Sequence, residues 1–380
     1  MKVALELQPC LKNRSGIGTY TYELAKRLQA KNTVELEGHI FNFMMRNDLS
    51  QELDGLRFSQ KYCTVFSYGV YRRIWNIVPI PYRWLFKQDA AITHFFNFIV
   101  PPGVKGKVVT TIYDVVWLRY PETMDEKNYK RITQDIQYSI SRADRIVTIS
   151  ESTKQDLVAL LQVPAEKIVI ASPGVDMVRF QQQYSAEPLQ YVQQRYHLPE
   201  RYILYMGTLE PRKNIERLVQ AFAQLQQQDN LQSYKLVLAG KKGWQYETIF
   251  TQIQQLGMED AVICTDYVAE EDKAAIYQMA DLFVFPSLYE GFGMPILEAM
   301  AAGVPVITSN VSSMPEVAGD AALLIAPDSV EQIASAMQRL LTDEALRKQC
   351  VQRGYERCKV FTWERSADIL VQMYQQMMQE

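Results

Sequence analysis

Residues 288–303 read LYEGFGMPILEAMAAG and follow residues 281–286, a largely apolar run that is typical of a buried strand. Pro295 suits the first position of a helix, because the amide that proline lacks would have no partner there. The stretch therefore predicts a strand, a loop that contains two glycines, and a helix. At such a helix N-terminus the loop amides can face an anion or a sugar hydroxyl without obstruction by Cβ atoms.

Two glutamates bracket this loop. Glu290 lies before the glycines, and Glu298 lies eight positions later in the predicted helix. A carboxylate can accept hydrogen bonds from both hydroxyls of a vicinal diol, so such residues suit a ribose or a pyranose. The alternative is a pair of solvated glutamates, one of them favoured by the helix dipole. The glycines between them and the apolar strand before them favour sugar binding.

The E-x7-E spacing of Glu290 and Glu298 resembles the signature of the retaining GT-B glycosyltransferases of family 4, which include bacterial mannosyltransferases. The surrounding sequence, FPSLYEGFGMPILEAMAAGVPVITSNVSSMPEVAGDAALL, carries the same resemblance, which is looser in the N-terminal half of the chain. It implies an α/β fold of GT-B type, with two Rossmann-like doubly wound domains facing a central cleft. It also implies a donor-binding role for Val268, Gly291, Phe292, Gly293, Met294, Pro295 and Glu298.

The composition limits the classes of protein to consider. A chain of 380 residues, 48% of them hydrophobic, is long enough for two cores. Its net charge of −3 does not fit the strongly basic domain of a nucleic-acid binder. The five cysteines are scattered without a CxxC spacing, as in a reduced compartment. With neither a signal-peptide pattern nor an apolar run of about 20 residues, the chain is expected in the cytoplasm.

Strands that alternate with helices predict parallel sheets covered on both faces. Strands are expected at residues 2–7, 35–43, 107–113, 145–149, 167–171, 202–206, 235–239, 261–265, 282–285, 304–308 and 322–325. The predicted organisation is an N-terminal Rossmann-like acceptor domain (1–175), a Gln-rich linker (176–200), a C-terminal Rossmann-like donor domain (201–360) and a C-terminal helix (361–380). The resemblance implies that this helix returns to the N-terminal domain.

Residues 207–214, GTLEPRKN, join a predicted strand to a predicted helix. Arg212 and Lys213 therefore lie where the helix dipole and two cationic side chains both favour an anion. Adjacent cations at a solvated helix start are common and often have no function. This segment resembles the diphosphate-binding loop of the family, which implies donor contacts at Gly207 and Thr208. Some relatives carry arginine where Thr208 stands, so one phosphate contact is expected to be absent.

The chemistry of the leaving group explains why cations are needed. Breaking a glycosyl–diphosphate bond places negative charge on the β-phosphate, and preorganised donors lower that barrier. The chain contains no Asp-x-Asp motif to hold Mg²⁺. We therefore expect Arg212, Lys213 and helix amides to act in place of a metal, and no cofactor. The resemblance implies retaining hexosyl transfer by same-face attack, with Glu290 on the donor sugar and Glu298 on the ribose.

A second glycine turn is predicted near the N-terminus. Gly16 and Gly18 end a polar loop between a strand and a helix, but Thr21 occupies the place of the third glycine in the dinucleotide fingerprint. Glycine in a turn more often meets a backbone requirement than a ligand. The resemblance nevertheless implies that Gly16 and Gly18 bind the donor, in a loop between its phosphates and the acceptor.

Asp114 follows a predicted strand, at the end where α/β proteins bind ligands. Many relatives carry a His-Asp pair here, with the histidine beside the transferred sugar, whereas this chain has Tyr113 and Asp114. The tyrosine hydroxyl could still donate one hydrogen bond to a ligand. Asp114 is a candidate for binding or deprotonating the acceptor, and the alternative role is a cap of a helix or turn.

Residues 68–87, YGVYRRIWNIVPIPYRWLFK, combine four basic residues with interleaved aromatic residues and contain no acidic residue. One interpretation places the aromatic side chains in the core. The other is an interfacial patch that docks on anionic headgroups or on a lipid-phosphate acceptor. The second interpretation predicts peripheral contact with the inner face of a membrane.

The leading functional hypothesis is a glycosyltransferase that moves mannose from GDP-mannose to a glycan or lipid-linked glycan, as in the synthesis of an O-antigen or another surface polysaccharide. The sugar and the base follow from the overall resemblance to mannosyltransferases. The alternatives are a UDP-sugar donor, a GT-B sugar-nucleotide epimerase, and a non-catalytic partner that binds sugar nucleotides. No metal and no nucleic-acid partner are expected.

Overall fold

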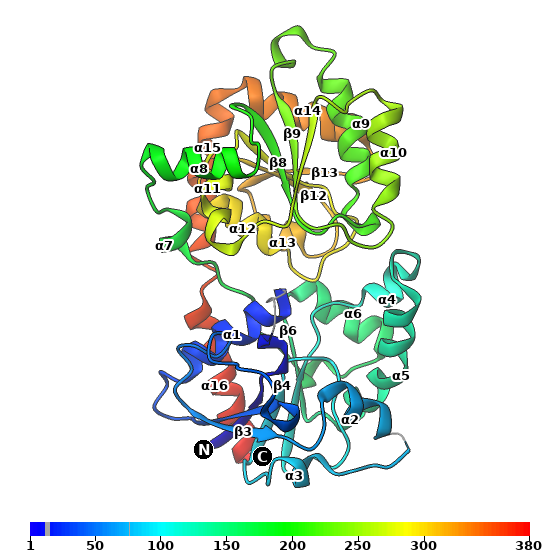
Figure 1. Cartoon of the computed structure of the whole chain (residues 1–380), viewed down its shortest axis with the longest axis vertical. Coiled ribbons are helices and arrows are strands. Elements are labelled where there is room, and N and C mark those ends of the chain that lie inside the picture. Colours follow the sequence, from blue (N-terminus) through cyan, green and yellow to red (C-terminus); the bar gives the residue numbers. More distant parts are fainter. Residues whose placement is uncertain (12–15, 76) are drawn as a thin grey trace. The chain divides into compact units, whose positions relative to one another are not determined.

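The computed structural model describes residues 1–11, 16–75 and 77–380, and the chain divides into two compact units (Figure 1). The first unit comprises residues 1–117, 126–173 and 363–380. The second unit comprises residues 118–125 and 174–362. The C-terminal residues therefore belong to the same unit as the N-terminus.

The first unit is built on a parallel sheet of seven strands in the order β3-β2-β1-β4-β5-β6-β7. The strands are β1 (Lys2–Glu6), β2 (Glu35–Phe41), β3 (Ser59–Cys63), β4 (Ile92–Phe95), β5 (Lys107–Thr111), β6 (Arg145–Thr148) and β7 (Ile168–Ile170). Strands β3 and β4 are absent from the sequence prediction. The first reads SQKYC, which is too polar to suggest a strand, and the second reads ITHF, with polar residues at its two central positions.

Helices lie on both faces of this sheet, as a parallel sheet requires (Figure 1). Helix α1 packs against α16, and α2, α5 and α6 lie on the other side. The helices are α1 (Gly16–Leu28), α2 (Tyr68–Ile74), α3 (Tyr82–Leu85), α5 (Glu126–Arg142), α6 (Glu151–Leu161) and α16 (Trp363–Gln379), and the short α4 (Val116–Arg119) begins where the first unit gives way to the second.

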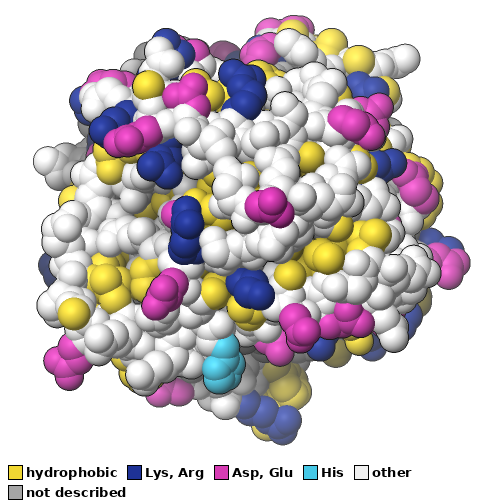
Figure 2. Space-filling model, turned by 90° about the horizontal axis from the view of Figure 1, so that it is seen from above, with side chains coloured by type: hydrophobic (Ala, Val, Ile, Leu, Met, Phe, Trp, Pro, Cys, Tyr) yellow, Lys and Arg dark blue, Asp and Glu magenta, His cyan; other side chains and the backbone are white. Residues whose placement is uncertain are grey.

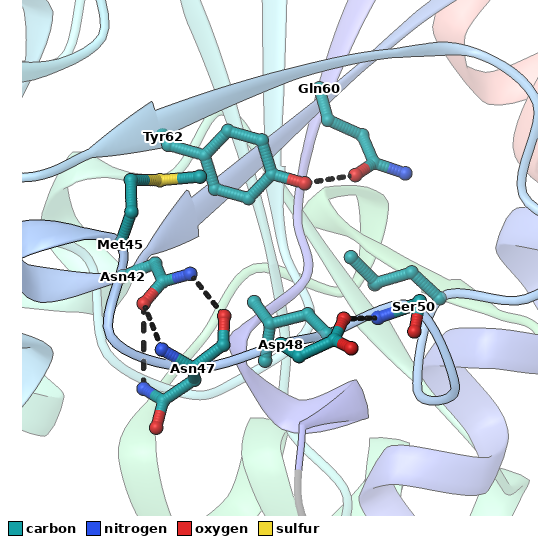
Figure 3. Close-up of a pocket in the computed structure, with 9 residues that line it drawn as sticks. Asn42, Met45, Asn47, Asp48, Ser50, Gln60 and Tyr62 are labelled. Atoms are coloured by element: carbon teal, nitrogen blue, oxygen red, sulfur yellow. Dashed lines mark hydrogen bonds between the residues drawn. The ribbon is translucent and has the colours of Figure 1, made fainter.

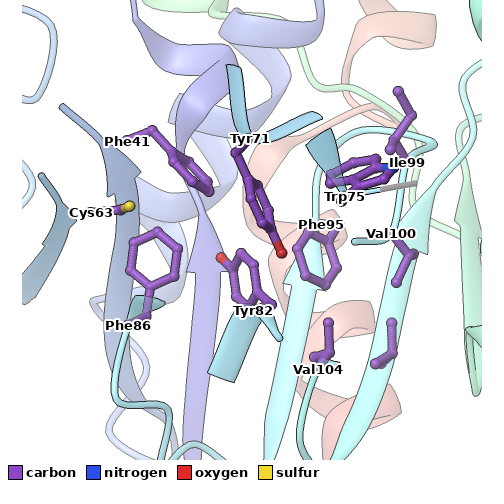
Figure 4. Packing of buried hydrophobic residues seen from close by; sticks show 11 residues of the cluster. Phe41, Cys63, Tyr71, Trp75, Tyr82, Phe86, Phe95, Ile99, Val100 and Val104 are labelled. Carbon is purple, nitrogen blue, oxygen red and sulfur yellow. The ribbon is translucent and has the colours of Figure 1, made fainter. Parts of the chain in front are cut away.

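The aromatic side chains of residues 68–87 form part of the core of the first unit (Figure 4). Tyr71 and Tyr82 are fully buried, and Trp75 and Phe86 are nearly so. Tyr71 stacks on Phe41 of β2 with the ring centroids 5.4 Å apart. The core interpretation is confirmed for these side chains, because they cover the apolar face of the sheet instead of meeting solvent.

One basic residue of the same segment is paired within the first unit. Arg72 forms an ion pair of 2.9 Å with Asp135 of α5. Trp84 stays 67% exposed, in contrast to its buried aromatic neighbours. Residue 76 of this segment lies outside the described residues. Contact of residues 68–87 with a membrane stays a prediction from the sequence, now without most of its aromatic anchors.

The second unit is built on a parallel sheet of six strands in the order β10-β9-β8-β11-β12-β13. The strands are β8 (Tyr202–Met206), β9 (Lys235–Ala239), β10 (Val262–Asp266), β11 (Leu282–Phe285), β12 (Val306–Ser309) and β13 (Ala322–Ile325). Four of them, β8, β9, β11 and β13, have the predicted bounds. The strand order reverses between β8 and β11, as in a doubly wound nucleotide-binding fold.

The helices of the second unit form two groups on the faces of its sheet (Figure 1). Helix α9 packs against α10 and α14, and α12 packs against α11, α13 and α15. The helices are α7 (Met177–Phe180), α8 (Ala186–Arg195), α9 (Ile215–Leu225), α10 (Glu247–Gln255), α11 (Lys273–Gln278), α12 (Met294–Ala301), α13 (Met314–Ala318), α14 (Val330–Thr342) and α15 (Glu344–Cys358).

The range 176–200 differs from the linker that the sequence predicts. It carries α7 and α8 and falls within the second unit. Phe180, Val192 and Leu198 are buried there. Because most of the glutamines around them are exposed, the sequence shows a polar segment in which a few widely spaced apolar residues make the contacts.

Helix α16 is bonded to the sheet of the first unit. The Nδ1 atom of His94 lies 2.6 Å from the Tyr374 hydroxyl of α16, and its Nε2 atom lies 2.8 Å from the Thr111 hydroxyl. Burial lowers the pKa of His94 to about 3. A neutral ring with a partner at each nitrogen stabilises the attachment of the C-terminal helix.

Glu6 is a buried carboxyl group at the end of β1. Its side chain accepts a hydrogen bond of 3.0 Å from the Gln8 amide and is only 3% exposed. Burial raises its pKa from 4.5 to about 8, and the Gln8 hydrogen bond offsets only part of this effect. Between pH 4.5 and about pH 8, Glu6 keeps its proton in the folded protein but loses it in the unfolded chain. The stability of the folded protein therefore falls as the pH rises through this range.

The substitution Glu6→Gln is therefore expected to stabilise the first unit at alkaline pH. Each unit of pKa shift corresponds to about 1.4 kcal/mol, so the variant should melt several degrees higher than the wild type at pH 9. At pH 5 the difference should be much smaller, because the folded wild-type side chain is neutral there. Thermal unfolding of both proteins at the two pH values measures this. An equal difference at both would contradict the burial of a protonated Glu6.

The face seen in Figure 2 carries both kinds of charged side chain, dispersed among polar and apolar ones. In the described part of the chain, no helix combines the length and the apolar character needed to cross a membrane.

Candidate active site

The candidate site lies where the second sheet reverses its strand order. Strand β8 pairs with β9 on one side and with β11 on the other. Helix α9 follows β8 and begins at Ile215, and α12 follows β11 and begins at Met294. Open α/β sheets bind ligands outside the carboxyl ends of their strands at such a reversal. Residues 207–214 and 286–293 connect these strands to these helices and form the site.

Hydrogen bonds hold these two loops together. The Leu288 amide donates to the Arg212 carbonyl at 2.9 Å. The buried Asn214 side chain donates to the carbonyls of Pro286 at 3.0 Å and Pro327 at 2.6 Å. Asn214 has a φ of 60°, in the left-handed region that asparagine tolerates better than most residues. The loop after β8 is thereby fixed against the loop after β11.

Arg212, Lys213 and Glu290 meet in this site. The Oε1 atom of Glu290 lies 2.5 Å from Lys213 Nζ, and its Oε2 atom lies 2.9 Å from Arg212. Arg212 also donates to the Tyr289 carbonyl at 2.6 Å and pairs with Glu210 at 2.7 Å. The side chain of Glu290 is only 11% exposed. Two cations and two carboxylates give this cluster no net charge before a ligand binds.

The cations keep Glu290 ionised in spite of its burial. Burial by itself would raise its pKa, but Arg212 and Lys213 together lower it to about 2. Burial and the neighbouring Arg212 lower the pKa of Lys213, and Glu290 opposes both effects. The Lys213 ammonium also lies 5.2 Å from the centre of the Phe285 ring, a cation–π distance. The site therefore presents charges of both signs in partly desolvated positions.

Glu298 lies in the second turn of α12, which begins at Met294. Its Oε2 atom accepts a hydrogen bond of 3.0 Å from the buried Tyr277 hydroxyl of α11. Glu298 also acts on Lys273, the first residue of α11. Burial alone would lower the pKa of Lys273, but the carboxylates of Glu298 and Glu270 outweigh this effect and raise it above its usual value. Glu298 is half-buried, so its carboxylate is oriented by Tyr277 while part of the side chain stays accessible.

The glycine loop is fixed by two serines. Ser312 Oγ accepts from the Glu290 amide at 3.0 Å and donates to the Glu290 carbonyl at 2.5 Å. Ser313 Oγ lies 2.8 Å from the carbonyl oxygens of both Glu290 and Phe292. Gly293 has a φ of 107° directly before α12, a conformation that side chains disfavour. The loop backbone is thus preformed from Glu290 to the helix.

The predicted donor-binding residues of this loop occupy the following positions. Gly291 and Phe292 are buried, Met294 is the first helical residue and Pro295 the second, one position later than predicted. Phe292 packs edge-on against Phe361 with the ring centroids 5.4 Å apart. Its aromatic ring is therefore part of the packing that supports the loop.

Gly207, Thr208 and Val268 lie after strands of the same sheet. A Cβ atom on Gly240, which follows β9, would lie 2.0 Å from the Gly207 carbonyl oxygen, so the backbones after β8 and β9 are in close contact. The Thr208 carbonyl accepts from the Tyr205 hydroxyl at 3.1 Å. Val268 is buried after β10. All three residues belong to the carboxyl edge of the second sheet.

The remaining candidates, Gly16, Gly18 and Asp114, belong to the first unit. Helix α1 already begins at Gly16, so the prediction of a loop that continues to Gly18 is wrong, and Gly18 is a buried helical residue. The space around Gly16 would accommodate a Cβ atom without a clash. Residues 12–15 of the predicted loop lie outside the described residues.

Asp114 and Tyr113 make local contacts. Asp114 accepts a hydrogen bond of 3.1 Å from the Val116 amide at the start of α4, which is the capping contact of the alternative interpretation. The Tyr113 hydroxyl donates to the Phe96 carbonyl at 2.9 Å and is buried. The expectation that this hydroxyl could donate to a ligand is therefore not met in this structure.

Five residues of the site had no role predicted from the sequence: Glu210, Asn214, Tyr289, Ser312 and Ser313. The structure shows that these residues hold the backbone or the charged side chains of the site. One signal was available for the serines, because short polar residues follow the buried strand β12 at the edge where ligands bind. The Tyr289 contact uses a backbone carbonyl and leaves no trace in the residue type.

In the ranges that the structure describes, no group of three or more His, Cys, Asp or Glu residues is arranged to hold a metal ion. The positive charge at the site is supplied by Arg212 and Lys213. Their guanidinium and ammonium groups are suited to phosphate oxygens.

Both halves of the chain match known protein families. Residues 14–179 match the model "Glycosyltransferase Family 4", and residues 192–357 match the model "Glycosyl transferases group 1". The chain is 32% identical to O-antigen chain mannosyltransferase B of Escherichia coli, over 98% of this chain and 99% of that protein. It is also 32% identical to the serotype-specific mannosyltransferase WbdA of Escherichia coli, over 73% of this chain but only 34% of that protein.

The fold is likewise that of a known glycosyltransferase class. Sucrose-phosphate synthase from Thermosynechococcus elongatus superposes with a TM-score of 0.75 over 100% of this chain and 99% of that chain, at 21% sequence identity. The predicted GT-B class of the two parallel-sheet units is confirmed by this match. The full-length match to a curated relative and the two family models show that the chain belongs to glycosyltransferase family 4 and is a glycosyltransferase.

Proposed function

We propose that this glycosyltransferase transfers mannose from GDP-mannose to a glycan or lipid-linked glycan acceptor in the synthesis of a surface polysaccharide, with retention of the anomeric configuration. The observation that carries the proposal is the meeting of Arg212 and Lys213 with Glu290 at the reversal of the second sheet. The activity for which the full-length relative is named, that of an O-antigen chain mannosyltransferase, supports mannose as the sugar. GDP is proposed as the carrier nucleotide on the same likeness.

The cluster suits departure of a nucleoside diphosphate. As the glycosidic bond breaks, negative charge grows on the β-phosphate, and fixed cations stabilise it most where water is partly excluded. Arg212 and Lys213 have only 16% and 12% of their side chains exposed. Their charges are therefore held in a partly desolvated place before the donor arrives, and no metal is required to supply them.

Glu290 is proposed to act on the donor sugar. Its pKa of about 2 means that it is ionised at neutral pH, so it can accept hydrogen bonds from sugar hydroxyls and steady positive charge at the anomeric carbon. Incoming phosphates compete for Lys213 and Arg212 and thereby release its oxygens toward the sugar. The acceptor hydroxyl attacks from the face that the diphosphate leaves, and its proton passes to the departing phosphate.

Glu298 is proposed to hold the ribose of the donor. The substitution Glu298→Gln keeps the size of the side chain and removes its charge, and it is expected to raise the donor KM about tenfold while kcat changes less than threefold. The reason is that a ribose contact is equally strong in the ground and transition states. Steady-state kinetics with varied donor concentration measure both constants. A loss confined to kcat would assign Glu298 to the chemical step.

The proposal also predicts the effect of chelators. Because Arg212 and Lys213 provide the positive charge, incubation with excess EDTA is expected to leave the initial rate within about twofold of the untreated enzyme. Added Mg²⁺ should have an equally small effect. A rate that falls to the background with EDTA and returns with Mg²⁺ would contradict the role given to the two cations.

The experiment that tests the proposed function is a transfer assay with purified protein, a panel of GDP-, UDP- and ADP-sugars, and a mannose-terminated oligosaccharide acceptor. GDP-mannose is expected to give a product one hexose larger with an α-linkage in its NMR spectrum. A product from a UDP-sugar alone would replace the proposed donor. An inverted linkage would overturn retention, and donor binding without a product from any pair would contradict the proposed mannose-terminated acceptor.

A further inference from the structure

A separate cavity lies in the first unit, between the edge strand β3 and the segment that follows β2 (Figure 3). Its volume is about 360 Å³, near the lower end of the range for ligand-binding pockets. It is lined by Asn42, Met45, Asn47, Asp48, Leu49, Ser50, Leu53, Gln60 and Tyr62. None of these residues belongs to the site at β8 and β11.

The cavity has two walls with complementary chemistry. Figure 3 shows Gln60 and Tyr62 of β3 on one side, and Asn47, Asp48 and Ser50 on the other. The Tyr62 hydroxyl bonds to Gln60 Oε1, which orients the amide so that its nitrogen remains a donor. In the described part of the chain no hydrogen bond of that nitrogen to another protein group is present. The Tyr62 ring and the buried Leu49 add apolar surface.

The loop wall is held in place before any ligand binds. The buried Asn42 donates to the Asn47 carbonyl at 2.9 Å and accepts from the Asn47 amide at 3.2 Å. Asp48 accepts from the Ser50 amide at 3.0 Å. Farther along, the Tyr22 hydroxyl of α1 donates to the Asp54 carbonyl at 2.8 Å. A preformed wall lowers the entropy that a ligand loses on binding.

The charges around the cavity exclude several ligand classes. Among the described residues, Asp48 is the one charged residue of the lining, so the cavity offers no cationic side chain to pair with a phosphate or another anion. The amides, the hydroxyls and the carboxylate offer too many polar groups for an apolar ligand. Amide and hydroxyl groups each pair well with sugar hydroxyls, which both donate and accept, and an aromatic ring packs against the apolar face of a pyranose.

We infer that this cavity binds one neutral hexopyranose unit of the acceptor glycan. The inference rests on the proposed function for the identity of that glycan, but the binding itself can be measured without donor or turnover. The site would hold a sugar of the acceptor through Gln60, Asp48 and the Tyr62 ring, and so select for neutral glycans of sufficient length.

The test is saturation-transfer NMR with the full chain and an α-linked mannotriose as the probe. The variants are Gln60→Leu, which removes the amide at similar size, and Asp48→Asn, which removes the charge and keeps an acceptor for the Ser50 amide. The matched control is Gln376→Leu, on the exposed side of α16 in the same unit. A thermal melt of each protein, with and without GDP, checks that it is folded and binds nucleotide.

With the wild type, saturation transfer to the mannotriose is expected. This NMR signal should fall at least fivefold in Gln60→Leu, fall clearly in Asp48→Asn, and stay unchanged in Gln376→Leu. Equal signals in all proteins would place the sugar elsewhere and overturn the inference, as would the absence of a signal in the wild type. If the variants lose sugar binding but GDP does not raise the melting temperature of any protein, the inference about the cavity would be supported. The same result would contradict the proposed donor.

Discussion

Replacing Lys213 by alanine is expected to lower kcat by about two to three orders of magnitude, which is the usual effect of removing one group that stabilises charge in the transition state. The reason is the position of this lysine, whose side chain is only 12% exposed and whose ammonium lies 2.5 Å from Glu290. When the diphosphate leaves, this charge is already in place and needs no rearrangement of solvent. Product formation at saturating donor measures kcat directly.

The matched control for this variant is Lys348→Ala. Lys348 is a lysine of α15 in the same unit, and it is 76% exposed in a surface pair with Glu344. Surface ion pairs of this kind contribute little to stability, about 0–1 kcal/mol. The control should keep the wild-type rate. If Lys213→Ala stayed within threefold of that rate, Lys213 would be removed from the catalytic machinery.

Replacing Glu290 by glutamine is expected to separate donor binding from turnover. The cluster of Arg212, Lys213, Glu210 and Glu290 has no net charge in this structure, and the variant would leave it with one positive charge. GDP should therefore bind more tightly, by about tenfold or 1.4 kcal/mol. The same substitution should lower kcat by about 100-fold, because it removes the carboxylate that stabilises positive charge at the anomeric carbon.

Calorimetric titration with GDP and steady-state kinetics on the same preparation measure the two effects of Glu290→Gln. The control is Glu356→Gln on α15, a substitution at an exposed glutamate that forms a surface ion pair with Lys359, just after the end of that helix. Weaker GDP binding together with the loss of turnover would mean that Glu290 chiefly orders the loop. Tighter binding with unchanged turnover would remove it from the chemical step.

The fold could be predicted best where strands are buried on both faces. Strands β8, β9, β11 and β13 have the predicted bounds because buried parallel strands read as short apolar runs between polar turns. Strand β3, SQKYC, is at the sheet edge and most of its residues are only partly buried, so its sequence carries no such run. Strand membership there depends on pairing with β2, which the residues of β3 do not reveal.

The charged residues of the site could be named from the sequence, but their contacts could not. Lys213 and Glu290 are 77 residues apart and meet only because β11 pairs with β8. No sequence motif predicts that both cations pair with Glu290, or that Arg212 also pairs with Glu210. The sequence likewise could not show that Tyr113 bonds to Phe96, since the partner is a backbone carbonyl.

The aromatic segment at 68–87 shows a limit of composition. Arginines beside tyrosines and tryptophans fit both a core and an interface, and only tertiary contacts distinguish them. Tyr71 and Tyr82 pack on the first sheet, whereas Trp84 is exposed. Residues 176–200 show the same limit in reverse, because their exposed glutamines concealed two helices.

The most direct test of the central claim is a thermal shift measurement with GDP, UDP, ADP and their sugar conjugates on the wild type and on Lys213→Ala. A ligand that binds only the folded state raises the melting temperature by mass action. GDP and GDP-mannose are expected to stabilise the wild type selectively, and Lys213→Ala should lose most of that shift. Selective stabilisation by another base would replace GDP, and a shift that is absent with every nucleotide, or undiminished in Lys213→Ala, would contradict a diphosphate site at Arg212, Lys213 and Glu290.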